Sequence, residues 1–247
     1  MSSLWLTETL GVPIIASIVG VLASQIASYA SNERLTKKLE WTVLALSKDA
    51  NSKHAEILQS VVNEVEARLL ASHFAPRKSF FATIFIVPTV GLLMGIPSDE
   101  PLMVQNAQRA FFLFYCAWFT FSGHKALMKH KALKLYFLSS PSKYATELPI
   151  ADNDYSNHLT IKGAISLLFG STGLALLLAY FSYSVDTGML PSTSWASTMG
   201  FLIAFFTTCL AFPYLPLENQ KISRSWSSTL IERAKRQKMV NDNNNPA

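Results

Sequence analysis

The stretch AFFLFYCAWFTFSGHKALMKHKALKLY, residues 110–136, passes abruptly from an uncharged apolar run to four lysines and two histidines. Such a change is typical of the place where a spanning helix leaves the bilayer, because a charged side chain inside the hydrocarbon is costly. Lysines near an anionic membrane surface each contribute about 1 kcal/mol of attraction to the headgroups. The predicted lipid-headgroup contacts on this helix are Lys125, Lys129, Lys131 and Lys134.

The same contrast repeats along the 247-residue chain, in which half of the residues are hydrophobic and only 15% are charged. Soluble domains carry about 25% charged residues. The stretches without Asp, Glu, Lys or Arg are residues 9–32, 79–98, 110–123, 163–185 and 187–217. A spanning helix needs roughly 20 mostly apolar residues; four stretches reach this length, and the third does so by extending back past Arg109 to about Leu102.

We therefore predict an all-α polytopic integral membrane protein with five transmembrane helices and a cytoplasmic helical hairpin. The predicted spans lie near 5–30, 79–97, 102–123, 162–184 and 195–216. Buried helices of a soluble protein are the alternative, but such helices keep a polar face. Residues 12–30 and 164–181 have no charged side chain at any helical angle.

Lysine and arginine are sorted to alternate connecting segments. Segments 31–78, 124–162 and 217–247 hold 20 of the 21 basic residues. Positive residues that flank spans stay on the cytoplasmic side, so we predict a multi-pass protein of the plasma (cell inner) membrane with its N-terminus outside and its C-terminus in the cytoplasm. A cleaved signal peptide is the alternative for the first helix, but MSSLWLTE lacks a positive n-region. The second and third helices could also form a re-entrant hairpin, which charge counting does not distinguish from two spans.

The ends of the predicted spans and of the basic segments give the predicted organisation of the chain. The parts are transmembrane helix 1 at 1–30, a cytoplasmic amphipathic hairpin at 31–78, transmembrane helices 2 and 3 at 79–123, a cytoplasmic basic helix and loop at 124–161, transmembrane helices 4 and 5 at 162–216, and a cytoplasmic amphipathic basic tail at 217–247 with disordered last residues. The apolar stripes of the hairpin are Leu35, Leu39, Val43 and Leu46 on one helix and Ile57, Val61, Val65 and Leu69 on the other.

The tail carries apolar residues four apart among basic ones, a pattern typical of a helix that lies in the membrane interface. A solvated helix is the alternative. The apolar residues are Ile222, Trp226 and Leu230, and the predicted headgroup contacts beside them are Arg233, Lys235 and Arg236.

Small residues at a spacing of four predict close packing between transmembrane helices, because hydrophobicity alone does not hold helices together in lipid. The predicted packing residues are Ala16, Gly20, Ser24, Gly91, Gly95, Ser166, Gly170, Gly200 and Ala204. We expect most of them to serve a five-helix bundle, with one ridge left for a homo-oligomer or a membrane-protein partner.

Groups that carry chemistry are scarce. No ionisable residue lies inside a predicted span away from its ends, which argues against proton-coupled transport. Cys116 and Cys209 have no neighbouring ligand, and His124 and His130 are six residues apart, unlike helical metal ligands at i, i+4. We predict no catalytic residue, cofactor, metal or nucleic-acid partner. The DND triplet at 152–154 could hold Mg²⁺ against a phosphate, although such triplets more often form turns.

The expected function is therefore that of a non-catalytic multi-pass membrane protein. It would act as an accessory subunit, scaffold or sensor/effector through helix–helix contacts, with the lipid bilayer and a second membrane protein or a second copy as partners. One alternative is an oligomeric channel or pore lined by Ser and Thr. The other is a membrane-embedded enzyme that uses the DND loop.

Overall fold

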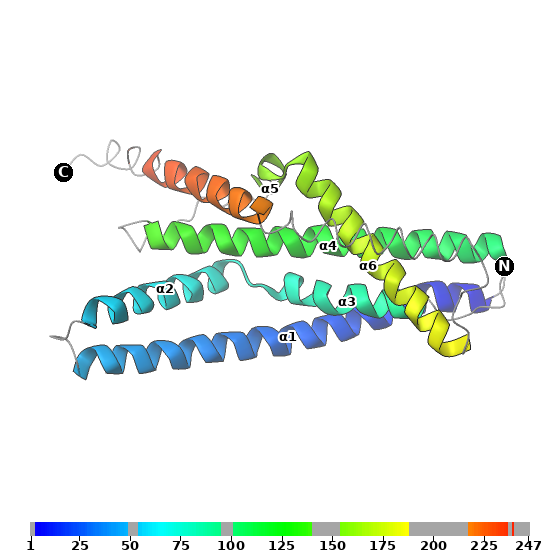
Figure 1. The fold of residues 1–247 in the computed structure, drawn as a ribbon, viewed down its shortest axis with the longest axis horizontal. Helices are drawn as coiled ribbons and strands as arrows, with labels where there is room; N and C mark the ends of the chain where they lie inside the picture. Colours follow the sequence, from blue (N-terminus) through cyan, green and yellow to red (C-terminus); the bar gives the residue numbers. More distant parts are fainter. Residues whose placement is uncertain are drawn as a thin grey trace. The chain divides into compact units, whose positions relative to one another are not determined.

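The computed structural model describes residues 3–48, 54–94, 101–139, 154–187, 217–236 and 239, and no strand occurs among them. The helices are α1 (Ser3–Lys48), α2 (Ala55–Phe74), α3 (Lys78–Met94), α4 (Leu102–Ser139), α5 (Asp154–His158) and α6 (Ile161–Thr187) (Figure 1). A further helix over 217–236 is drawn in orange and red. The described part of the chain is thus almost entirely helical, as predicted.

The chain divides into two compact units. Unit 1 contains residues 1–27, 78–124 and 160–218, and unit 2 contains residues 28–77, 125–159 and 219–247. The divisions at 27/28, 77/78, 124/125, 159/160 and 218/219 fall beside the limits predicted from charge, at 30/31, 78/79, 123/124, 161/162 and 216/217.

Two helices run through these limits without a break, unlike the separate elements predicted on either side. α1 joins the first predicted span to the first helix of the predicted hairpin, and α4 joins the third predicted span to the basic helix. Residues 21–48 contain neither Gly nor Pro, so nothing in the backbone interrupts the helix at the change in charge.

Two described helices are long and apolar enough to cross a membrane, Ile14–Lys48 and Ile161–Tyr180. A third candidate is the pair α2 and α3, which are bent by 73° at their junction and pass the same test only together. These candidates overlap the first, fourth and second predicted spans. Within the described residues α4 is not among the candidates, since Gln105, Asn106, Gln108 and Arg109 lower its apolar content. The fifth predicted span lies outside the described residues.

Unit 1 has a core formed by the first part of α1 with α3, α4 and α6. Its fully buried members are Ala16, Ile86, Val90, Cys116 and Ala175. A Cβ atom built on Gly91 would lie 2.9 Å from the carbonyl oxygen of Ala175. Since that oxygen belongs to the backbone of α6, α3 and α6 approach each other as closely as a glycine permits.

Hydrogen bonds fix the helix ends and one crossing in unit 1. The Thr160 hydroxyl accepts a bond of 3.0 Å from the Gly163 N–H and donates one of 3.0 Å to Glu218 Oε2, which is the bonding expected of an N-cap residue. Between α3 and α4, Thr83 Oγ1 lies 2.8 Å from the Phe119 carbonyl oxygen. A Cβ atom on Gly123 would overlap Thr83, so this glycine makes room for the bonded hydroxyl.

Candidate functional site: the core of unit 2 and its polar edge

Unit 2 is assembled from three segments that are far apart in the sequence. Its core contains alanines of α2, the second half of α4, Tyr155 of α5 and the helix over 217–236. The fully buried large side chains are Met128, Leu133, Tyr136, Ile222, Trp226 and Leu230. The three basic segments therefore form one helical domain with a shared apolar interior.

The apolar stripe of the C-terminal helix is buried inside this core. Ile222, Trp226 and Leu230 are only 1–2% exposed. They cannot rest on lipid while they pack against α4, so the structure differs from the predicted interfacial helix and from its solvated alternative. An amphipathic stripe requires an apolar partner, and here that partner is protein.

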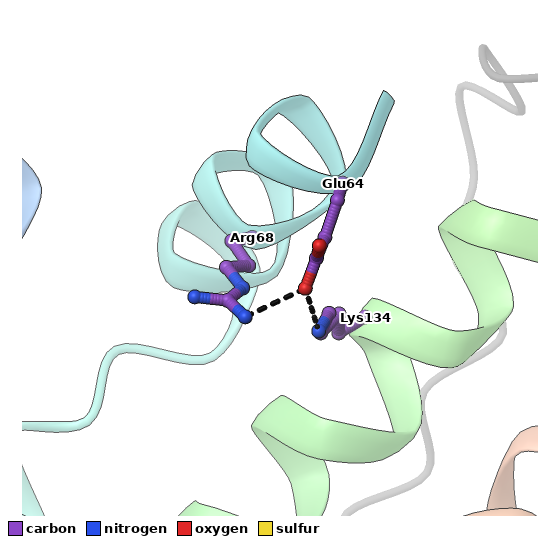
Figure 2. Close-up of polar contacts among 3 residues, drawn as sticks. All are labelled: Glu64, Arg68 and Lys134. Atoms are coloured by element: carbon purple, nitrogen blue, oxygen red, sulfur yellow. Dashed lines mark hydrogen bonds and ion pairs between the residues drawn. The ribbon is translucent and has the colours of Figure 1, made fainter. Parts of the chain in front are cut away.

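Glu64 joins α2 to α4 at the edge of the core (Figure 2). Its Oε1 atom accepts hydrogen bonds from Arg68, one turn further along α2, at 2.6 Å and from Lys134 of α4 at 2.9 Å. The bonds from Lys134 and Arg68 lower the pKa of the Glu64 carboxyl. Because Glu64 is 44% exposed, these ion pairs are worth at most about 1 kcal/mol each. Of the two, the pair with Lys134 joins the helices.

His130 lies on α4 one turn before Lys134 and is 5% exposed. Its Nδ1 atom is 3.3 Å from the carbonyl oxygen of Ala75, and because a carbonyl only accepts, Nδ1 carries the hydrogen. Ala75 directly follows the last residue of α2, where the helix no longer supplies a hydrogen-bond donor for the carbonyl group. The bond from His130 gives this carbonyl a partner. Burial, followed by the charges of Arg77 and Lys134, lowers the pKa of His130 to about 4. The imidazole is therefore neutral at pH 7.

Basic side chains gather around this junction. Arg77 donates a hydrogen bond of 2.8 Å to the hydroxyl of Ser31 on α1, which ties the segment after α2 to α1. Burial and the charge of Arg68 lower the pKa of Arg77, and burial lowers the pKa of Lys131. The polar edge of unit 2 is thus electropositive, with Glu64 neutralising part of the charge.

Aromatic rings hold α5 against the C-terminal helix. Tyr155 and His158 each place their ring centroids 6.1 Å from that of Trp226, and the His158 ring is stacked on it. His158 Nδ1 lies 3.0 Å from the Ser225 hydroxyl. Burial raises the pKa of Tyr155, so the phenol stays protonated. These contacts position α5, the helix that begins at the last residue of the DND triplet.

The described residues offer little reactive chemistry. No group of three His, Cys, Asp or Glu side chains is placed to hold a metal ion in the described part of the chain. Glu64 has its carboxylate engaged by two cations, and His130 is buried in a hydrogen bond to the backbone. Asp152 and Asn153 lie outside the described residues, as does the side chain of Asp154. The site that the structure builds is a packed domain with a charged edge.

The structure places most of the predicted packing residues inside unit 1. Ala16 and Ser24 are buried, Gly20 lies against Ile86 of α3, and Gly91 lies against Ala175 of α6. Ser166 and Gly170 are half-buried. Gly95, Gly200 and Ala204 lie outside the described residues, so the Gly200 ridge stays a prediction.

The lysines predicted to contact lipid headgroups are only partly exposed. Lys125, Lys129, Lys131 and Lys134 are all half-buried, and Lys134 is bonded to Glu64. On the C-terminal helix Arg233 is half-buried, whereas Lys235 and Arg236 are exposed. Lipid contact by these residues stays a prediction, and Lys134 has an additional role within unit 2.

Hydroxyl groups of unit 1 mostly bond to their own helices. Ser24 donates to the Val21 carbonyl at 2.8 Å, and Ser171 and Thr172 donate to the Leu168 carbonyl at 3.0 and 2.8 Å, which is common for hydroxyls in spanning helices. Ser17 instead bonds the Tyr115 hydroxyl, linking α1 to α4. Among these four hydroxyls, that of Ser17 joins two helices and the other three bond within one.

Sequence reasoning missed the residues that join α2 to α4. One signal was present: Ala67, Ala71 and Ala75 repeat every four residues before Pro76, and all three are buried in the unit 2 core. The predicted α2 stripe began with Ile57, which is exposed. The Glu64–Lys134 pair spans 70 residues, and no local pattern announces it.

Comparisons with protein-family models, with curated proteins and with solved structures find no match. The function of the chain is therefore inferred from these structural features and from the sequence.

Proposed function

We propose that this chain is a non-catalytic, multi-pass protein of the plasma membrane. Unit 1 would lie in the bilayer, and unit 2 would form a cytoplasmic domain that acts as an accessory subunit, scaffold or sensor/effector. The partner would be another membrane protein or a second copy of the chain.

The observation that carries the proposal is the coincidence of two independent divisions. Charge alone separates the basic segments from the apolar ones, and packing separates unit 2 from unit 1 within about three residues of the same five positions. Basic flanks mark the cytoplasmic side. A domain folded from all three basic segments fits a single cytoplasmic compartment.

The surface of unit 1 supports a lipid environment. Apolar side chains that are more than one-third exposed cover its helices, among them Ile14, Ile15 and Ile18 of α1, Phe114 and Trp118 of α4, and Ile165 and Phe169 of α6. A soluble monomer rarely exposes large contiguous apolar patches. In a bilayer the same side chains meet lipid tails at no cost.

The polar edge of unit 2 favours binding over catalysis. The Glu64 carboxylate and the buried His130 serve contacts between helices, and the neighbouring Arg77 and Lys134 are basic. A folded helical domain can present a surface to a partner, which is the role of an accessory subunit or scaffold.

Two experiments test the proposal. A reporter fused after residue 247 is expected on the cytoplasmic side, and a pull-down of the full chain in mild detergent is expected to recover a stoichiometric partner or a homo-oligomer. A reporter on the outer side, or a purified chain that is monodisperse in buffer without detergent, would overturn the membrane assignment. Conductance of the purified chain in a planar bilayer would overturn the assignment as a non-conducting protein.

A further inference from the structure

Positive charge is concentrated in unit 2 where α2 lies against α4. Arg68 and Lys134 bond the same oxygen of Glu64 (Figure 2), so both cations already reach one anionic acceptor atom. Arg77 acts on the same region. Burial and then the charges of Arg77 and Lys134 lower the pKa of His130. Burial and then the charge of Arg68 lower the pKa of Arg77.

The cations outnumber the carboxylates among the described charges that act on one another here. Glu64 brings one negative charge against the positive charges of Arg68, Arg77 and Lys134. Like charges held near each other disfavour their own charged forms, and groups perturbed in this way gather at functional sites. A phosphate monoester carries a charge of about −1.5 to −2 at pH 7 and three acceptor oxygens. It therefore matches the surplus of positive charge in both sign and size.

Ser72 adds a hydroxyl group that has no hydrogen-bond partner within the described residues. Its side chain is buried, with 8% exposed. Ser60 on the same helix instead donates to the Ile57 carbonyl at 2.7 Å, which is the usual bonding of a helical serine. Ser72 lies one turn after Arg68, and residues four apart are neighbours on a helix surface. Because a buried hydroxyl without a partner is costly, Ser72 points to an acceptor supplied by a ligand beside Arg68.

We propose that Arg68, Ser72 and Lys134 form a binding site for a phosphate group. Arg77 adds a further cation. The guanidinium and ammonium groups donate charge-assisted hydrogen bonds to the phosphate oxygens, and the Ser72 hydroxyl donates a neutral one. Glu64 competes with the phosphate for Arg68 and Lys134.

Two sources supply this chemistry: the headgroup of an anionic phospholipid and a phosphate in solution. The chain passes from unit 2 into unit 1 directly after Arg77, and in the proposed function unit 1 lies in the bilayer. Basic pockets on the cytoplasmic side of spanning helices bind lipid phosphates. The inference therefore rests on the proposed function for the lipid source, whereas binding of phosphate from solution does not depend on it.

Calorimetric titration of the full chain with inorganic phosphate tests the site, in a non-ionic detergent and with chloride at equal ionic strength as the reference. Arg68→Gln should weaken binding about tenfold or more, as for the loss of a charged hydrogen bond. Ser72→Ala should weaken it about threefold or more without loss of stability, because it removes a buried hydroxyl that lacks a partner. Arg34→Gln is the matched control, since Arg34 is an exposed arginine on the α1 part of unit 2, and it should leave the affinity unchanged.

Glu64→Gln is expected to strengthen binding, a result that loss of the fold cannot produce. The substitution releases Arg68 and Lys134 from the carboxylate and removes one negative charge, so phosphate should bind several-fold more tightly. Three outcomes would overturn the inference: a Glu64→Gln chain that binds no more tightly than the wild type, a Ser72→Ala chain that binds as the wild type does, or a wild-type chain that responds to phosphate as it does to chloride.

Nanodiscs separate the two sources. The full chain is placed in discs of phosphatidylcholine alone and in discs that also contain phosphatidic acid, whose headgroup is a phosphate monoester. A lipid source raises the Tm in the second discs, and Arg68→Gln removes this increase while Arg34→Gln keeps it. Equal Tm values together with binding of inorganic phosphate assign the site to a phosphate in solution. A chain that binds phosphate but is monodisperse without detergent sinks only the proposed function, whereas a membrane-bound chain that binds no phosphate sinks only this inference.

Discussion

Acidification should destabilise unit 2 through His130. The ring is buried between α4 and the end of α2, with its Nδ1 hydrogen directed to the Ala75 carbonyl. Protonation would place a cation in the interior beside Arg77 and Lys134, both of which already lower its pKa. The folded chain therefore resists taking up the proton, whereas the unfolded chain accepts it readily.

The size of the effect follows from the two pKa values. Above pH 6.5 the ring is neutral in both states and contributes nothing to the pH dependence. Between pH 6.5 and about 4 only the unfolded chain binds the proton, so the free energy of unfolding falls as the pH falls, and below about 4 the loss is complete. At 1.36 kcal/mol per pKa unit, the total loss is about 3 kcal/mol.

The assay compares His130→Gln with the wild type, as full chains in one mild detergent, by thermal unfolding at pH 7.5 and pH 4.5. Glutamine can still donate to the Ala75 carbonyl but does not titrate. On going from pH 7.5 to pH 4.5, the free energy of unfolding should fall by about 2–3 kcal/mol less for the variant than for the wild type. For a chain of this size that corresponds to about 4–12 °C in Tm.

His73→Gln is the control, because His73 is an exposed histidine at the end of α2. It should leave the pH dependence of the wild type unchanged. Glu64 also titrates in acid, but it is present in all three chains and cancels in the comparison. If the difference in Tm between His130→Gln and the wild type is the same at pH 7.5 and 4.5, the reasoning about His130 is refuted.

The other predictions concern helix packing and the edge of unit 2. Gly91→Ala should destabilise the chain by about 1–3 kcal/mol relative to Gly11→Ala in thermal unfolding, because a Cβ atom meets the Ala175 carbonyl oxygen at Gly91 and nothing within 4 Å at Gly11; equal Tm values for the two variants would contradict the close packing of α3 and α6. Glu64→Gln, which removes both ion pairs, should cost at most about 2 kcal/mol at low salt and less in 1 M salt, and a loss that does not depend on salt would show that the ion pairs are unimportant. Trp226→Ala should cost about 3–5 kcal/mol, whereas Trp226→Phe, which removes a buried indole N–H that has no hydrogen-bond partner among the described residues, should cost much less; a chain that tolerates Trp226→Ala would show that the C-terminal helix does not belong to the core.

Part of the candidate site could be read from sequence, and part could not. The four-residue spacing of Ile222, Trp226 and Leu230 predicts an amphipathic helix, and a helix is present. The same stripe fits a membrane surface equally well, because periodicity reports that an apolar partner exists and not which one. Only the fold shows that the apolar partner of this stripe is protein, namely the core that contains Met128, Leu133 and Tyr136.

Local sequence was enough to establish the helical class, the sorting of charge and the approximate positions at which one compact unit gives way to the other. These depend on local quantities: hydrogen bonds within each helix, and the cost of placing charged side chains in an apolar medium. Long-range packing was needed to show that α1 and α4 cross the predicted limits unbroken, that three distant segments share one core, and that Glu64 meets Lys134. Contacts between residues far apart in the chain depend on which helix faces fit each other, and that fit is a property of the packed molecule.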